Sequence, residues 1–240
     1  MSSSLRQKLI IIVLLLYWPT IFVLTHIPIP QIVSEAQVSD KTLHLVVYLI
    51  LVFLLWFAVS PDKKVNWSKA AIWWVLLITA GYGGIDEILQ KYTGRGCDIK
   101  DFLANLVGVA GGLILFSFLR FQPALLTVTG IVIFCLTNTA QANLAELVPV
   151  TNAMFHLIAY AVFTMLWIRQ IYPLASKTTR PKQMIIALAV PTGLLLAVKL
   201  FSAISGRYFT LFDVITSITG MAVAAAGYVF ICPKCSRRIH

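Results

Sequence analysis

The residues able to do chemistry in this 240-residue chain gather in its first half, near the ends of predicted helices. His44 and Tyr48 are one helical turn apart, and so are Asp101 and Asn105, so each pair shares a helix face. Glu87 lies in an acidic run between the two pairs. An imidazole beside carboxylates can act as a general base, so His44 and Glu87 are the candidates for proton transfer.

Further polar groups adjoin these pairs. Asp86, Glu87 and Gln90 end one predicted helix, and a short connection from Lys91 to Lys100 leads to the next. This connection brings two helix ends together, so we expect the polar groups on both to converge on one ligand. The predicted ligand-binding residues are Tyr48, Asp86, Glu87, Gln90, Arg95, Asp98, Asp101 and Asn105. Arg95 would hold an anionic group, while the acids would meet hydroxyls, amines or a cation.

Two other roles stay open for the same groups. Three or four ligands among His44, Asp86, Glu87, Asp101 and Asn105 would suit a divalent cation, but the spacing matches no particular metal motif. No metal is therefore assigned, and the cofactor is unknown. Alternatively, Arg95 pairs with Asp101 or Asp86 and fixes the connection, and His44 is a hydrogen-bonded structural histidine.

Long apolar segments must position these groups. Hydrophobic residues make up 59% of the chain and charged residues 12%, which leaves too little polar surface for a water-soluble protein. A helix needs about 20 residues to cross a hydrocarbon core of ~30 Å. The sequence predicts an all-α, polytopic membrane bundle of about eight transmembrane helices, near 9–27, 43–59, 70–90, 101–119, 124–140, 153–170, 184–203 and 211–231. Gly108, Gly111 and Gly112 give the fourth of these helices small residues for close packing.

The basic residues predict the orientation of this bundle. Of the 19 Lys and Arg residues, 13 lie on one predicted side and 5 on the other. The positive-inside rule then places both termini in the cytoplasm and the polar residues at the outer face. The same rule accounts for the formal charge of +10 without nucleic acid, so membrane lipids are the predicted partners. Cys232 and Cys235 lie in a basic tail and are predicted to be free thiols.

The second half of the chain repeats the first at a fixed offset of 112 residues. His44, Tyr48, Arg95 and Asp101 correspond to His156, Tyr160, Arg207 and Asp213. Coincidences among such rare polar types indicate duplication, whereas leucine matches are expected in any membrane protein. We therefore predict two parallel four-helix repeats, 1–120 and 121–231, related by a pseudo-twofold axis, and a basic cytoplasmic tail at 232–240.

The repeats differ at their acidic positions. Asp86, Glu87, Gln90, Asp98 and Asn105 correspond to Val198, Lys199, Ser202, Thr210 and Ser217. Residues shared by both repeats are therefore expected to hold each unit together, as an Arg207–Asp213 pair would. The first repeat is expected to carry the activity, and the second to be degenerate. Lys199 would either reach the outer surface or neutralise Asp213.

Three runs of the first repeat resemble VanZ-like membrane proteins: IDEILQ at 85–90, GR at 94–95 and DFLANLVG at 101–108. The upstream run HLVVY at 44–48 fits the same pattern. The second repeat keeps the shared polar positions and Gly220 but departs at the acidic pair. The resemblance implies a bacterial cytoplasmic membrane protein and, in some members, low-level resistance to teicoplanin, a glycopeptide antibiotic. It supplies no mechanism.

Four functions are open at this point. We favour an outward-facing polar pocket that binds a cell-envelope component, such as a lipid head group or lipid-linked saccharide. The alternatives are a membrane enzyme of envelope lipid or glycan metabolism and a non-catalytic structural or partner-binding protein. A transporter is allowed by parallel repeats, but the segments at mid-membrane carry no acidic residue.

Overall fold

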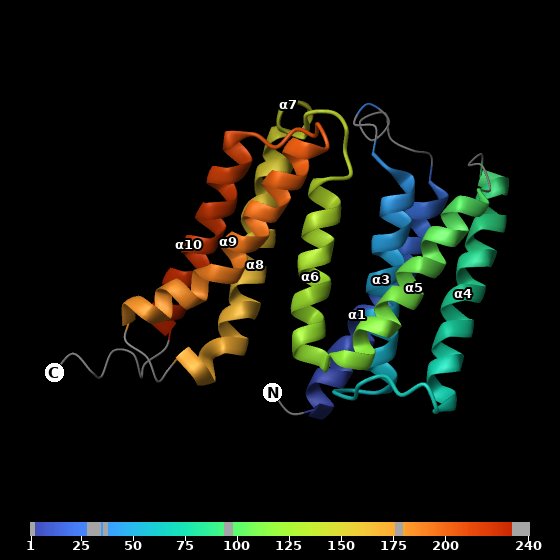
Figure 1. The fold of residues 1–240 in the computed structure, drawn as a ribbon. Coiled ribbons are helices and arrows are strands. Elements are labelled where there is room, and N and C mark those ends of the chain that lie inside the picture. Colours follow the sequence, from blue (N-terminus) through green and yellow to red (C-terminus); the bar gives the residue numbers. More distant parts are fainter. Residues whose placement is uncertain (1–2, 28–34, 36–37, 94–97, 176–179, 232–240) are drawn as a thin grey trace. The chain divides into compact units, whose positions relative to one another are not determined.

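The structure is a computed structural model, and it describes residues 3–27, 35, 38–93, 98–175 and 180–231 (Figure 1). Within these residues every regular element is a helix. The prediction of an all-α, polytopic membrane bundle is confirmed.

Eight long helices lie in the described part of the chain. They are α1 (Ser3–His26), α3 (Asp40–Val59), α4 (Ala70–Gln90), α5 (Ile99–Phe118), α6 (Phe121–Thr137), α8 (Pro149–Ala175), α9 (Arg180–Ile204) and α10 (Leu211–Ile231). Two single turns, η1 (Lys91–Thr93) and α7 (Leu144–Leu147), connect them. Seven of the long helices are long and apolar enough to cross a membrane. The eighth, α6, has 17 residues and spans about 26 Å, somewhat less than a typical hydrocarbon core of ~30 Å.

The outward faces of these helices suit lipid. Large apolar side chains such as Leu15, Leu16 and Trp74 are more than half exposed. Such a density of exposed apolar groups is typical of a lipid-facing surface and not of one that meets water. The chain is therefore a multi-pass membrane protein in contact with membrane lipid.

Two compact units divide the chain. The first comprises Met1–Ser34 and Val38–Thr139, and the second Glu35–Gln37 and Ala140–His240. Unit 1 includes α6 because the Phe121 ring on α6 packs against Phe53 and Phe57 of α3, with ring centroids 5.7 and 5.3 Å apart. The boundary between the compact units therefore lies after α6, whereas the boundary between the predicted repeats lies before it. The repeats themselves stay a prediction.

The centre of unit 1 is the contact between α3 and α5. A Cβ atom added at Gly108 would lie 2.5 Å from the Leu45 carbonyl oxygen, and one at Gly112 would lie 2.6 Å from Val52 Cγ1. Only glycine permits so close an approach of two helices, which confirms the expected packing at these two positions. Gly111 has nothing within 4 Å and takes no part in it.

Unit 2 contains a matching contact between α8 and α10. A Cβ atom added at Gly220 would overlap the Leu157 carbonyl oxygen. Gly220 and Leu157 lie 112 residues after Gly108 and Leu45. In each unit, therefore, a glycine sets one helix directly against the backbone of another.

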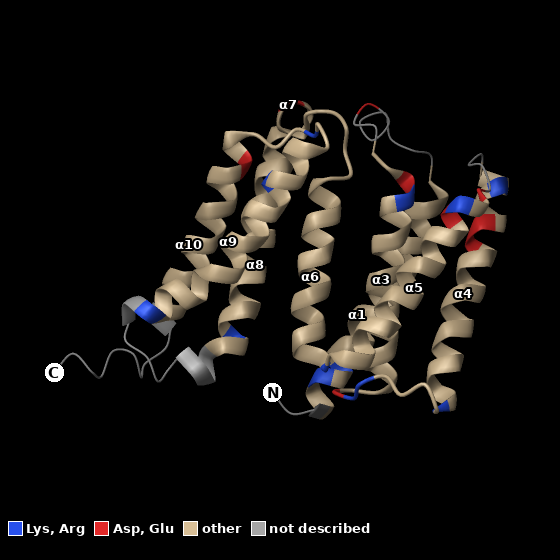
Figure 2. Cartoon of the chain, in the orientation of Figure 1, with Lys and Arg blue, Asp and Glu red and all other residues tan. Residues whose placement is uncertain are grey.

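Charged residues mark the two ends of unit 1 (Figure 2). Most of its acidic residues lie at the end where α3 begins and α4 ends. At the opposite end, Arg6 near the start of α1 pairs with Asp62, with 2.7 Å between Nη2 and Oδ2. Which end faces the cytoplasm stays a prediction of the positive-inside rule.

Candidate functional site

Buried polar side chains gather at the end of unit 1 where α3 begins and α4 ends. We call them the polar cluster: His44 and Tyr48 from α3, Asp86, Glu87 and Gln90 from α4, and Asp101 and Asn105 from α5. The helical spacing expected from the sequence places each group on an inward face. The close contact at Gly108, one turn below Asn105, brings α5 near enough for its polar groups to meet those of α3.

Glu87 is the least satisfied member of the polar cluster. Its side chain is 3% exposed, and neither carboxylate oxygen accepts a hydrogen bond of ordinary geometry from the described residues, although the Asp98 backbone N–H interacts with the carboxylate. The nearest charged partner is His44, whose Nδ1 lies 3.6 Å from Glu87 Oε1. A buried carboxylate without well-placed donors costs several kcal/mol, so this group calls for a partner outside the described protein atoms.

His44 is oriented by Asn105. Its Nδ1 lies 3.0 Å from Asn105 Oδ1. Because an amide oxygen can only accept, this geometry places the proton on Nδ1 and leaves the Nε2 lone pair free. Nε2 faces the opposite direction and lies 3.7 Å from Asp40 Oδ1.

Asp86 uses both of its oxygens within the protein. Oδ1 accepts a hydrogen bond from Thr25 Oγ1 of α1 at 3.0 Å, and Oδ2 accepts one from Gln90 Nε2 at 2.9 Å. His26 Nδ1 lies 3.8 Å from the same Oδ1. These bonds favour a positioning role for both residues: Gln90 orients Asp86 within α4, and the bond from Thr25 to Asp86 holds α1 against α4 beside Glu87.

Lys41 links two acids at the start of α5. Its Nζ lies 3.4 Å from Asp101 Oδ1 and 3.5 Å from Asp98 Oδ2. Asp98 caps α5 by accepting a hydrogen bond from the Lys100 backbone N–H at 2.9 Å. That N–H, and next the Lys41 ammonium, hold the pKa of Asp98 below its usual value.

Tyr48 Oη and Asn105 Nδ2 are among the further groups of unit 1 that are buried without a hydrogen-bond partner among the described residues. Tyr48 Oη and Asn105 Nδ2 converge on Gly83, because a Cβ added there would lie 3.4 Å from each. Unit 1 therefore holds unpaired donors as well as an unpaired carboxylate. Such groups normally have partners, and their clustering is typical of a site that binds water or a ligand.

The acid of unit 2 that corresponds to Asp101, Asp213, is buried and satisfied. Asp213 Oδ1 accepts from Asn152 Nδ2 at 2.5 Å, and Oδ2 accepts from the Thr210 backbone N–H at 2.7 Å. His156 Nδ1 lies 3.4 Å from Ser217 Oγ. Tyr160 is fully buried nearby and stacks on the His156 ring, although its Oη has no hydrogen-bond partner among the described residues. Unit 2 thus supplies its own donors to its acid.

Two expectations for unit 2 need correction. No ion pair joins Arg207 to Asp213 within the described residues, because Asn152 and Thr210 occupy the carboxylate instead. Lys199 does not pair with Asp213 either: its ammonium donates to the Phe209 carbonyl oxygen and lies over the Phe209 ring.

Some predicted residues lie outside the described ranges. They are Arg95, with its neighbours Gly94 and Cys97, and the cysteines of the tail, Cys232 and Cys235. The ligand-binding role of Arg95 therefore stays a prediction.

Sequence reasoning missed Asp40 and Lys41. It placed the start of the second helix at residue 43, whereas α3 begins at Asp40. The longer helix sets Asp40 one turn before His44, on the same face. Ligand atoms of Asp40, His44 and Asp101 all lie within 4.8 Å of one another. The i, i+4 spacing of Asp40 and His44 was the sequence signal that could have placed Asp40 beside His44.

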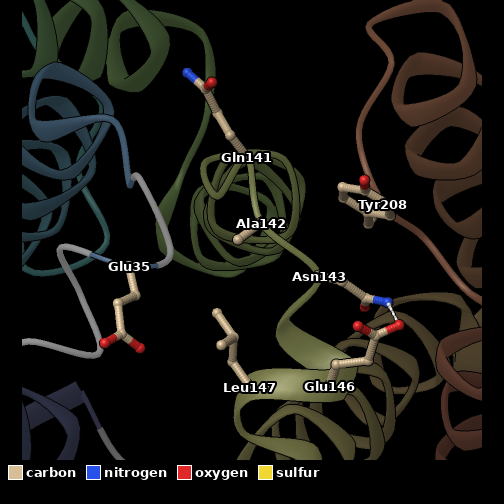
Figure 3. A pocket seen from close by; sticks show the side chains of 7 residues that line it. All are labelled: Glu35, Gln141, Ala142, Asn143, Glu146, Leu147 and Tyr208. Carbon is tan, nitrogen blue, oxygen red and sulfur yellow. Dashed lines mark hydrogen bonds between the residues drawn. The ribbon is translucent and has the colours of Figure 1, made fainter.

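A separate open cavity of about 460 Å³ lies in unit 2 (Figure 3). It is lined by Glu35, Gln141, Ala142, Asn143, Glu146, Leu147 and Tyr208. Asn143 Nδ2 donates to Glu146 Oε1 at 2.7 Å across its wall. None of the predicted site residues lines it, so we do not place the function there.

Comparison with known proteins finds a family match in the first half of the chain. Residues 6–120 match the VanZ/LLP1 family model. The first half of the chain is VanZ-like. The VanZ-like match contains the whole polar cluster and ends just before α6. Comparison with curated proteins gives no match, and neither does comparison with solved structures.

Proposed function

We propose that this VanZ-like protein binds the polar part of a cell-envelope component, such as a lipid head group or a lipid-linked saccharide, at the outer face of the bacterial cytoplasmic membrane. The observation that carries the proposal is the Glu87 carboxylate, which is buried and has no side-chain hydrogen-bond donor among the described residues. Hydroxyl or amine hydrogens of a ligand would supply those donors.

The unpaired groups match the chemistry of such a ligand. Glu87 offers two acceptors, while Tyr48 Oη and Asn105 Nδ2 offer donors. A sugar or an amino-alcohol head group carries both hydroxyl donors and oxygen acceptors. Each ligand bond would replace a missing one, and a hydrogen bond to a charged group contributes about 1.5–3 kcal/mol. Arg95 is proposed to hold an anionic part of the same ligand.

The place of the polar cluster favours a membrane-anchored ligand. It lies at the ends of helices whose outward faces are apolar, so a ligand with an acyl or prenyl chain could keep that chain in lipid. A site at the membrane surface is also where an envelope precursor exposes its polar group. We further propose that unit 2 is a related copy without this activity, since Lys199 corresponds to Glu87 there.

An enzyme acting on the same ligand is the second candidate. It is favoured by the 3.6 Å approach of Glu87 Oε1 to His44 Nδ1, a carboxylate–imidazole pair that could transfer a proton. In this version Glu87→Gln abolishes turnover while ligand binding survives. In the binding version Glu87→Gln loses the ligand itself.

Glycopeptide resistance would be one consequence of binding an envelope component. A protein that holds or alters such a component changes what teicoplanin meets at the cell surface. If so, expression in a susceptible host raises the inhibitory concentration of teicoplanin, and Glu87→Gln cancels the rise.

Native mass spectrometry of the purified protein, with lipids retained, tests the proposal. We expect a specific bound species on the wild type that is lost from Glu87→Gln. Glu146→Gln is the matched control, because Glu146 is an exposed acid of unit 2 that lies outside the polar cluster. A wild-type spectrum without bound species, or one unchanged in Glu87→Gln, would refute the proposal.

A further inference from the structure

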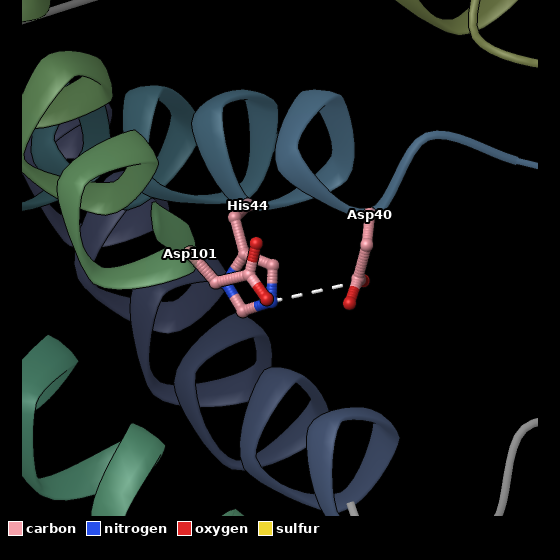
Figure 4. Close-up of side chains that lie close together, drawn as sticks. All are labelled: Asp40, His44 and Asp101. Atoms are coloured by element: carbon pink, nitrogen blue, oxygen red, sulfur yellow. Dashed lines mark ion pairs between the residues drawn. The ribbon is translucent and has the colours of Figure 1, made fainter. Parts of the chain in front are cut away.

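We propose that Asp40, His44 and Asp101 bind a divalent transition-metal ion at the start of α3. Asp40 and His44 lie one turn apart on α3, and Asp101 lies in the first turn of α5. Figure 4 shows the carboxyl groups of Asp40 and Asp101 beside the His44 ring.

The spacing of the three groups suits a shared ion. Their ligand atoms lie within 4.8 Å of one another, and His44 Nε2 lies 3.7 Å from Asp40 Oδ1. Metal bonds to nitrogen and oxygen ligands of about 2.1 Å place two ligands of a tetrahedral ion about 3.4 Å apart. A small side-chain adjustment would therefore close the site around an ion.

The orientation of His44 supports the same conclusion. Its Nδ1 proton is directed at Asn105 Oδ1, 3.0 Å away, with Glu87 Oε1 at 3.6 Å. A metal-binding histidine almost always donates its other ring N–H to a carbonyl or carboxylate, which fixes the tautomer and makes the free nitrogen more basic. Here the free nitrogen is Nε2, on the side of Asp40.

A buried acid with one long contact to a lysine is directed into the site. Asp101 is 6% exposed, and its Oδ1 has no hydrogen bond of ordinary geometry to the described residues. Its charged neighbour is Lys41, whose Nζ lies 3.4 Å away on a side chain that is 52% exposed. The lysine is long and partly solvated, so an entering cation could displace it.

Unit 2 provides an internal comparison. Asn152 stands 112 residues after Asp40, and its amide donates to Asp213 Oδ1 at 2.5 Å. The amide satisfies the acid there, so no cation is required. In unit 1 an aspartate occupies that position and cannot donate when ionised. Two carboxylates then face one imidazole, an arrangement that a cation stabilises.

The ligand set selects the type of metal. One imidazole nitrogen and two carboxylates suit Mn²⁺, Fe²⁺ or Zn²⁺ better than Ca²⁺, which prefers six to eight oxygen ligands. This inference goes beyond the proposed function, because an ion could be held whether or not an envelope component binds at Glu87.

Manganese binding to the full-length protein without a polyhistidine tag tests the inference. Free Mn²⁺ gives an electron paramagnetic resonance signal that falls on binding, and Mn²⁺ is a poor partner for the thiols of Cys232 and Cys235. After treatment with EDTA, we expect the wild type to bind one Mn²⁺ ion. Asp40→Asn, which copies the residue in unit 2, should weaken binding by roughly tenfold or more.

Asp62→Asn is the matched control. It makes the same substitution at the opposite end of unit 1 and should bind Mn²⁺ like the wild type. Asp40 is exposed, so Asp40→Asn is expected to fold, which gel filtration checks. Equal Mn²⁺ binding by the wild type and Asp40→Asn would overturn the inference.

The two proposals fail in distinguishable ways. Mn²⁺ binding that depends on Asp40, without any bound envelope component, leaves the metal site standing and removes the proposed function. If an envelope component binds in a way that depends on Glu87, while Mn²⁺ binding does not depend on Asp40, the proposed function stands and the metal site is removed.

Discussion

Replacing Gly108 by alanine tests the helix contact that positions the polar cluster. The added Cβ would lie 2.5 Å from the Leu45 carbonyl oxygen and 3.2 Å from the Leu49 backbone nitrogen. Both neighbours are backbone atoms and cannot rotate away. Because unbonded atoms settle at about 3.5 Å, α3 and α5 must separate by roughly 1 Å.

The expected cost follows from that separation. Overpacking of this kind costs about 1–3 kcal/mol, and the better helix propensity of alanine returns up to about 1 kcal/mol. Gly108→Ala should therefore lower the unfolding temperature in detergent by several degrees. The separation should also weaken Mn²⁺ binding, since His44 precedes Leu45 and moves with it.

Gly111→Ala is the matched control on the same helix. Nothing lies within 4 Å of its added Cβ, so its unfolding temperature should equal or exceed that of the wild type. Differential scanning fluorimetry measures both variants. If Gly108→Ala has the same unfolding temperature as Gly111→Ala and binds Mn²⁺ as the wild type does, then the close contact of α3 and α5 does not exist as described.

Two further substitutions test individual contacts. Thr25→Val removes the donor to Asp86 and should destabilise unit 1 by about 1.5–3 kcal/mol. Thr20→Val loses only a bond within α1 and should change the stability little. Equal unfolding temperatures of the two variants would contradict the positioning role of Asp86. Lys41→Met removes the ammonium that competes for Asp101 and should tighten Mn²⁺ binding. Weaker binding by Lys41→Met would argue against competition.

The helices were predictable because hydropathy and length determine where a chain can cross a membrane. The predicted stretches 70–90 and 211–231 coincide with α4 and α10, and the others differ from the structure by up to six residues at an end. Those few residues mattered at Asp40, because a helix start moved by three positions hid a member of the proposed metal site. Helix ends depend on local capping and on tertiary contacts that hydropathy does not report.

The members of the polar cluster were predictable, but their partners were not. Helical spacing placed His44 with Tyr48 and Asp101 with Asn105. The bond from Thr25 to Asp86, by contrast, joins residues 61 positions apart and depends on how α1 packs. The sequence also could not separate Asp86, whose oxygens are satisfied, from the adjacent Glu87, whose oxygens are not.

A cryo-electron microscopy map of the protein, purified with its native lipids, tests the central claim most directly. The claim is that a ligand supplies donors to the Glu87 carboxylate, for which the described side chains provide none. We predict non-protein density within hydrogen-bonding distance of the Glu87 carboxylate. A map in which side chains of the chain itself contact both Glu87 oxygens, with no other density present, would contradict it.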